Sequence, residues 1–129
     1  ALQFLSNKNA PFFLLVEAGF IDSGGHANNT GLIVEEMLDF DVAVEQALRF
    51  ADENGETLVI VTADHETGGL SLPHGNVTDR MIEGQFHSDD HTGILVPVFA
   101  YGPYSDLFCG VYDNTSIYFK IMEIINKAK

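Results

Sequence analysis

Residues 57–69, TLVIVTADHETGG, decide the fold. The run from 57 to 63 is mostly apolar and lacks the alternation of a half-exposed strand, which is typical of a strand buried on both faces of a parallel sheet. Residues 12–16, FFLLV, show the same pattern. A helical pattern lies between the two runs, so the order is strand, helix, strand, which predicts a parallel pair with a right-handed crossover. The sequence therefore predicts an α/β fold, with a mostly parallel sheet and flanking helices.

The helix between the two strands is predicted over residues 30–54. Its apolar positions recur at steps of three and four, which places them on one helix face. These positions are Ile33, Met37, Phe40, Val44, Leu48 and Ala51. Asn29 or Thr30 can cap the start of the helix, and Gly55 suits the position just past its end.

The remaining segments are interpreted in the same way. Residues 1–9 predict the end of a helix that stops at Asn9 and Pro11, and the glycine-rich residues 18–30 predict a loop. Residues 66–90 are polar and rich in glycine, and a loop of that length is uncommon unless it is functional.

The C-terminal part of the chain predicts one more strand and a closing helix. Residues 94–101 predict a third strand, near an edge or bulged because Pro97 cannot donate to a ladder. Residues 114–127 predict a helix with Ile117, Ile121 and Ile124 on its apolar face, and Lys127 and Lys129 suit its C-terminal end. We expect 1–129 to be a single, partial domain.

Composition limits the possible functions. The chain has 129 residues, with 19 Asp and Glu against 6 Lys and Arg, so its formal net charge is −13. Nucleic acids and anionic membranes require a basic face, so we expect neither as a partner. No run approaches the roughly 20 apolar residues of a membrane helix. A single cysteine excludes a disulfide framework and a cysteine-rich metal site.

Chargeable side chains follow the predicted strands at their carboxyl ends. Glu17 follows the first strand, and Asp64 and His65 follow the second. Sites in open α/β sheets form beyond the carboxyl ends of the strands, so these three side chains should lie within reach of one another. Asp22 and His26 lie in the loop at the same edge, and their i, i+4 spacing lets both face one point if that loop contains a helical turn.

His91 lies just before the third predicted strand. If that strand is parallel to the others, His91 lies at the wrong edge, so either the strand is antiparallel or the long loop carries His91 back. We favour the antiparallel strand.

These side chains together predict a metal site. Imidazoles and carboxylates without thiolates suit Zn²⁺, and also Mn²⁺ or Co²⁺. The candidate ligands are Glu17, Asp22, His26, Asp64, His65 and His91. They exceed one tetrahedral site and indicate two or more metals, the arrangement that clamps the oxygens in phosphoryl transfer. The alternative is that they are ordinary loop residues, with Asp64 capping a turn.

Three segments resemble the C-terminal part of an alkaline phosphatase. They are LVEAGFIDSGGHANN at 15–29, LVIVTADHETGG at 58–69 and DHTGILVPVFAYGP at 90–103, in the family's order. The resemblance covers nearly the whole chain and implies part of an alkaline-phosphatase-like sandwich. It also implies a zinc-dependent enzyme, periplasmic or extracellular, that hydrolyses phosphate monoesters through a phosphoserine.

The resemblance assigns a role to each candidate ligand. Asp22, His26 and His91 correspond to ligands of one zinc, Asp64 and His65 to ligands of a second zinc, and Glu17 to a ligand of magnesium. In such enzymes one zinc activates the serine nucleophile, and the other activates the water that cleaves the phosphoserine.

The chain departs from the family in one large respect. The nucleophilic serine belongs to an Asp-Ser-Ala type motif, which these 129 residues do not contain. Ser23 is not a substitute, because Gly-Gly-His follows it and matches the zinc-ligand segment. The phosphate-clamping arginine is also missing, since this chain has only Arg49 on the predicted helix and Arg80 in the long loop. We therefore expect this stretch alone to be catalytically inactive.

Two alternative functions remain open on the sequence. The chain is either part of a related phosphodiesterase, sulfatase or phosphomutase, or a metal-binding piece without catalysis. The opening ALQFLSNKNA has neither an initiator methionine nor an apolar leader, so we expect a piece of a longer protein. An incomplete sheet exposes an edge and apolar faces, which predicts a homodimer or marginal stability.

Overall fold

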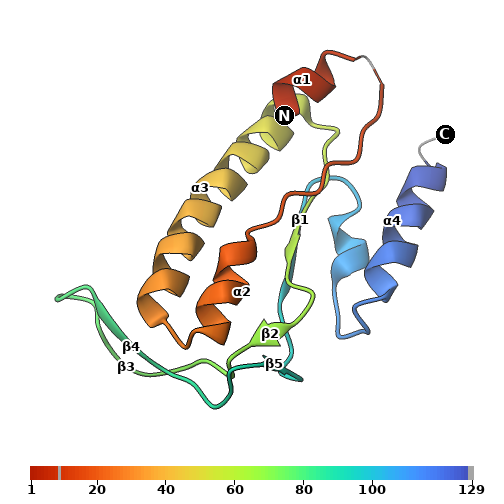
Figure 1. Cartoon of the computed structure of the whole chain (residues 1–129). Helices are drawn as coiled ribbons and strands as arrows, with labels where there is room; N and C mark the ends of the chain where they lie inside the picture. The colour runs from red at the N-terminus through yellow and green to blue at the C-terminus, as the bar shows by residue number, and fades with distance from the viewer. Residues whose placement is uncertain (9, 128–129) are drawn as a thin grey trace. The chain divides into compact units, whose positions relative to one another are not determined.

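A computed structural model describes residues 1–8 and 10–127, which form two compact units. The first unit comprises residues 1–44 and 65–95, and the second comprises residues 45–64 and the chain from 96 onward. Figure 1 shows the elements in chain order. They are α1 (Leu2–Ser6), α2 (Gly19–His26), α3 (Thr30–Asn54), β1 (Val59–Thr62), β2 (Glu66–Thr67), β3 (Ser71–Asn76), β4 (Met81–Gln85), β5 (His91–Thr92), β6 (Val98–Tyr101), the 3-10 helix η1 (Ser105–Phe108) and α4 (Ser116–Lys127).

The predicted loop over residues 18–30 is wrong, because most of it forms the helix α2. Asp22 lies in its first turn, where its negative charge complements the helix dipole, and His26 lies in its last turn. Gly24 and Gly25, which lower helix propensity, are the two buried residues of α2. Their lack of side chains lets neighbouring elements pack closely on the helix, and this tertiary contact outweighs the local preference.

The predicted helix over residues 30–54 is confirmed at both ends by α3. The Asn29 side chain accepts a hydrogen bond from the backbone N–H of Leu32 at 3.1 Å and so caps the start of the helix. Gly55 follows the last helical residue with φ of 71°, and its N–H donates to the Ala51 carbonyl. The apolar face is mostly half-buried, and Met37 on it stays 48% exposed.

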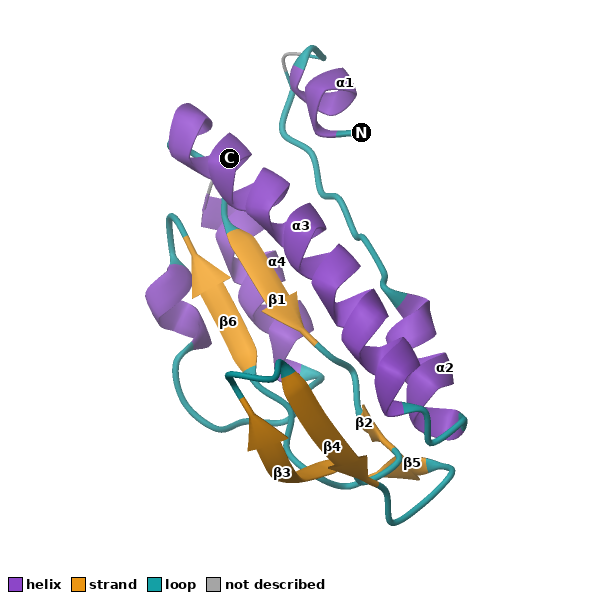
Figure 2. Cartoon of the chain, turned by 90° about the vertical axis from the view of Figure 1, so that its left-hand side faces the viewer, coloured by secondary structure: helices purple, strands orange, loops and turns teal. Residues whose placement is uncertain are grey.

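The parallel strand pair is the main correction to the predicted fold. All three sheets formed by the described residues have two strands and are antiparallel, and they pair β1 with β6, β2 with β5 and β3 with β4. Figure 2 shows the arrows of β1 and β6 pointing in opposite directions. The strand predicted over 57–63 is confirmed as β1, and the third predicted strand begins at Val98, directly after Pro97. It runs antiparallel, as favoured above.

Residues 12–16 form no strand in the structure, contrary to the prediction. Their apolar run predicts burial on both faces, yet Phe13 is 66% exposed and Leu15 is 79% exposed. A strand requires a neighbour that accepts its backbone hydrogen bonds, and an apolar run does not itself provide one. Because residues 12–16 form no strand, the predicted parallel pair with residues 57–63 is also absent from the described residues.

The predicted loop over residues 66–90 contains three short strands, of which β3 and β4 form a hairpin. Pro73 lies where the register shifts between Ser71 and His74. In a two-stranded sheet each strand has one unpaired side, so proline is tolerated. The Asn76 side chain accepts hydrogen bonds from the backbone N–H groups of Thr78 and Asp79, which forms the turn.

The predicted helices at the two ends of the chain are present as α1 and α4. Ile117, Ile121 and Ile124 lie half-buried on α4, and Lys127 pairs with Glu123 at 2.6 Å. The predicted helix stop at Asn9 and the C-terminal Lys129 lie outside the described residues. The buried apolar residues of the described chain are Ala51 and Phe108, both in the second unit. No described helix is long and apolar enough to cross a membrane.

Candidate metal centre

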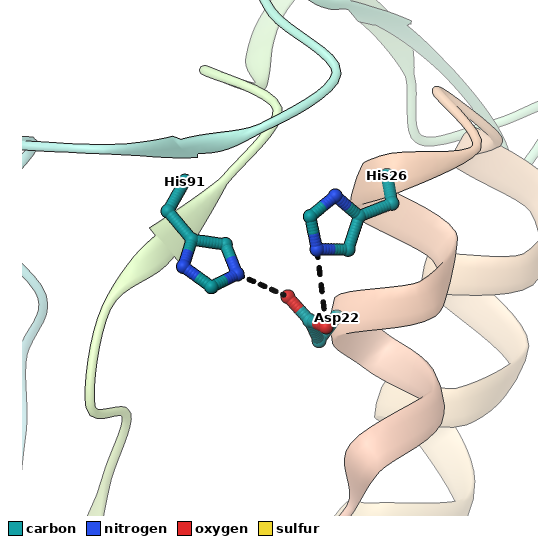
Figure 3. Close-up of side chains that lie close together, drawn as sticks. All are labelled: Asp22, His26 and His91. Atoms are coloured by element: carbon teal, nitrogen blue, oxygen red, sulfur yellow. Dashed lines mark ion pairs between the residues drawn. The ribbon is translucent and has the colours of Figure 1, made fainter.

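The first unit brings one carboxylate and two imidazoles together. Asp22 Oδ2 lies 3.4 Å from His26 Nε2, and Asp22 Oδ1 lies 3.6 Å from His91 Nε2. Figure 3 shows Asp22 between the two rings, with both dashed contacts ending on its carboxylate. One ligand atom from each of the three residues lies within 4.8 Å of the other two. All three side chains remain 39–48% exposed, so the cluster is accessible from solvent.

The helix α2 positions two members of the cluster. Asp22 and His26 are four residues apart, so a helix places them one turn apart on the same face. The predicted i, i+4 arrangement is therefore confirmed, although a complete short helix provides it rather than a single turn in a loop.

The pairing of β2 with β5 positions the third member. His91 is opposite Thr67 in the antiparallel register, so the two side chains lie on the same face of the ladder. The chain leading into β5 is tied to Gly68, whose N–H donates to the Asp90 carbonyl and whose carbonyl accepts from the N–H of His87. The long segment therefore carries His91 back to β2, which is the second of the two expected routes.

The electrostatics of the cluster favour a cation between its ligands. The Asp89 carbonyl lies 2.7 Å from His26 Nδ1 and can only accept a hydrogen bond, so Nδ1 carries a proton. That hydrogen bond, followed by the nearby carboxylate of Asp22, raises the pKa of His26. In the neutral tautomer, the lone pair of Nε2 faces an oxygen of Asp22. Two acceptors at 3.4 Å repel unless a proton or a metal ion lies between them.

Asp22 is held in its charged form by the same surroundings. The hydroxyl of Thr67 donates to Asp22 Oδ1 at 2.6 Å and is the main cause of the lowered pKa of this carboxyl. Desolvation opposes the shift, and the imidazoles of His26 and His91 add to it.

Of the other candidate ligands, His65 lies against the cluster. Its ring stacks on that of His91 with centroids 3.5 Å apart, and its Nδ1 lies 3.2 Å from the Thr67 hydroxyl oxygen. Glu17 is in the same unit but is not part of the three-residue ligand group. Asp64 belongs to the second unit, where its carbonyl accepts a hydrogen bond from Asn114 Nδ2 at 3.3 Å. Ser23 makes a hydrogen bond to the Gly19 carbonyl of its own helix.

Sequence analysis missed two residues that build the cluster, Glu66 and Thr67. The carboxylate of Glu66 accepts hydrogen bonds from the Gly69 and Leu70 N–H groups and from the Thr92 hydroxyl, so it joins β2, the following turn and β5. Desolvation opposes ionisation of Glu66, yet these hydrogen bonds hold its pKa below the ordinary value. A usable signal was present, because a carboxylate just before Thr-Gly-Gly is suited to accept the N–H groups of a tight turn.

Comparisons with known proteins identify the family of the chain. The sequence profile for alkaline phosphatase matches residues 1–83. The chain is 33% identical to alkaline phosphatase H of Pseudomonas aeruginosa, over 98% of this chain and 30% of that protein. It is 35% identical to the alkaline phosphatase of Escherichia coli, over 92% of this chain and 29% of that protein.

A solved structure shows the same fold. The alkaline phosphatase from the Antarctic bacterium TAB5 superimposes with a TM-score of 0.87 at 45% identity, over 95% of this chain and 38% of that one. A variant of the TAB5 enzyme was solved with Mg bound in its M3 site. The chain thus spans about a third of the length of the relatives it matches. Its fold is alkaline-phosphatase-like, and the chain belongs to the alkaline phosphatase family.

Proposed function

We propose that Asp22, His26 and His91 bind one Zn²⁺ ion. The observation that carries this proposal is the convergence of one carboxylate oxygen and two imidazole nitrogens within 4.8 Å. Zinc–ligand distances of about 2.0–2.1 Å place tetrahedral ligand atoms about 3.3 Å apart. His26 Nε2 lies 3.4 Å from one oxygen of Asp22 and His91 Nε2 lies 3.6 Å from the other, so each imidazole lies near that spacing from the carboxylate. Three protein ligands also leave a fourth position open, as in catalytic zinc sites.

The chain's own residues prepare this site. The Asp89 carbonyl holds the proton of His26 on Nδ1, so Nε2 is directed toward Asp22. The β2–β5 ladder holds His91 on the opposite side of the same carboxylate. When bound, zinc would supply positive charge for a phosphoryl oxygen and lower the pKa of a coordinated water.

We further propose that the whole protein hydrolyses phosphate monoesters through a phosphoserine. Family membership supports this, as does the resemblance that assigns Asp64 and His65 to a second zinc and Glu17 to magnesium. The protein is then a periplasmic or extracellular homodimer. Exposed apolar side chains, such as Phe13 and Leu15 in the first unit and Phe119 in the second, support covered surfaces on both units in the assembled protein.

A phosphatase assay on the 129-residue chain tests where the nucleophile lies. We expect no turnover of 4-nitrophenyl phosphate with added Zn²⁺ and Mg²⁺, because these residues contain no Asp-Ser-Ala type motif. The longer protein that contains this sequence should turn the substrate over, and should lose that activity in Asp22→Ala. Metal-dependent turnover by the 129 residues alone would contradict the assignment.

The pH dependence of the stability that His26 contributes should reverse when zinc is bound. The raised pKa of His26 means that its contribution to metal-free stability is complete below about pH 6.5 and is lost as pH rises through the folded pKa. Zinc requires the neutral imidazole, so zinc stabilisation should instead grow over the same pH range. Thermal unfolding of wild type and His26→Ala, with EDTA and with zinc, measures both trends. The same pH dependence of stability with EDTA and with zinc would contradict the assignment of His26 as a zinc ligand.

A further inference from the structure

The hydroxyl of Thr67 contacts both Asp22 and His65. Its hydroxyl oxygen lies 2.6 Å from Asp22 Oδ1 and 3.2 Å from His65 Nδ1. Its partner in the β2–β5 register is His91, whose ring stacks on that of His65. Thr67 is therefore in contact with, or directly opposite, three of the six candidate ligands.

The direction of the two hydrogen bonds follows from their chemistry. A hydroxyl has one hydrogen, and an ionised carboxylate can only accept. The hydrogen of Thr67 therefore points to Asp22, and its oxygen must accept at His65. His65 consequently carries its proton on Nδ1, which places the lone pair of the neutral ring on Nε2.

The backbone is built to hold Thr67 in this position. Gly25 on α2 packs so closely on β2 that an added Cβ would lie 2.8 Å from the Thr67 Cβ and 2.9 Å from its Cγ2 and carbonyl oxygen. Glu66, the residue before Thr67, ties β2 to Thr92 and to the turn that follows. The hydroxyl is thus placed by packing on one side and by hydrogen bonds on the other.

We propose that Thr67 is a positioning residue, whose single hydroxyl orients the Asp22 carboxylate and sets the tautomer of His65. It joins a ligand of the proposed zinc to a ligand that the resemblance assigns to a second zinc. The proposal rests on the proposed function for its metal, but its prediction for the tautomer of His65 holds in the metal-free chain.

The tautomer is measured directly by long-range ¹⁵N–¹H NMR of the imidazoles at pH 8.5 in EDTA, with the His65 signals assigned through His65→Gln. Wild type should show a protonated Nδ1 at His65. In Thr67→Val, which has the same shape without the hydroxyl, His65 should move toward the Nε2-protonated form that histidine prefers in water. Thr67→Ser should restore the wild-type pattern. A wild-type His65 with its proton on Nε2 would overturn the proposal without any variant.

Zinc affinity, measured by competition with a chelating dye, is the second readout. Removing a hydrogen bond to a metal ligand lowers affinity by roughly 10–100-fold, so we expect that loss in Thr67→Val and near wild-type affinity in Thr67→Ser. Thr78→Val, in the turn between β3 and β4, is the matched control and should bind as wild type. Equal affinity in wild type and Thr67→Val would overturn the proposal. If wild type binds no zinc, the proposed function fails, and the NMR experiment still decides the role of Thr67.

Discussion

Replacing Asp22 by alanine is expected to lower the zinc affinity of the chain by at least about a hundredfold. Loss of a group that only orients a ligand lowers metal affinity by roughly 10–100-fold, so loss of the ligand itself should reach or exceed the upper end of that range. Asp22 is also the member of the cluster that contacts both imidazoles, at 3.4 and 3.6 Å. Isothermal titration of zinc into wild type and variant measures the change.

The control for this experiment is another exposed aspartate of the same unit. Asp41→Ala, on the exposed side of α3, removes the same charge outside the ligand group and should bind zinc as wild type does. His74→Ala, in the β3 strand, serves in the same way for His26→Ala and His91→Ala. Equal losses in Asp22→Ala and Asp41→Ala would show that overall charge attracts the metal, and would contradict a site at Asp22.

The second large effect is expected for Gly25→Ala, which should destabilise the chain by about 1–3 kcal/mol. Alanine in place of glycine inside a helix ordinarily stabilises by roughly 1 kcal/mol. Here the new methyl group would lie 2.8–2.9 Å from the Cβ, the Cγ2 and the carbonyl oxygen of Thr67, so α2 and β2 must separate. Denaturant unfolding measures the change in the free energy of unfolding. A loss of stability indicates close packing of α2 on β2, whereas a gain indicates that helix propensity dominates.

Gly31→Ala is the matched control, because it also lies in a helix of the first unit. Its nearest neighbour would be the Asn29 Oδ1 at 3.4 Å, an ordinary contact. We expect Gly31→Ala to be neutral or stabilising. Gly25→Ala should also weaken zinc binding, since separation of α2 from β2 moves Asp22 away from Thr67. A Gly25→Ala chain as stable as Gly31→Ala would show that the two elements are not in tight contact.

Local signals predicted the parts of the fold that depend on neighbours in sequence. The bounds of α3 were predicted correctly because its apolar period, the Asn29 cap and Gly55 all act within one or two turns. The helix α2 was missed because Gly24 and Gly25 have low helix propensity, and only packing against other elements explains them. Strand pairing depends on distant partners, so residues 12–16 had the pattern of a buried strand without a ladder to join.

The candidate metal site, like the fold, was predictable only where its signals are local in sequence. Residue type and the i, i+4 spacing indicated Asp22 and His26, and residue type and its place before the third predicted strand indicated His91. The link between β5 and β2 was not readable from the sequence, because strands of two residues carry no periodic signal. Thr67 was missed for the same reason, since its importance comes from lying opposite His91 and against α2.

The most direct measurement is anomalous X-ray scattering at the zinc edge, from crystals of the chain grown with zinc. The account predicts a peak bonded at about 2.0–2.2 Å to an oxygen of Asp22, to Nε2 of His26 and to Nε2 of His91. Zinc bound elsewhere, zinc bound to one or none of these three residues, or no zinc at a saturating concentration would contradict the central claim.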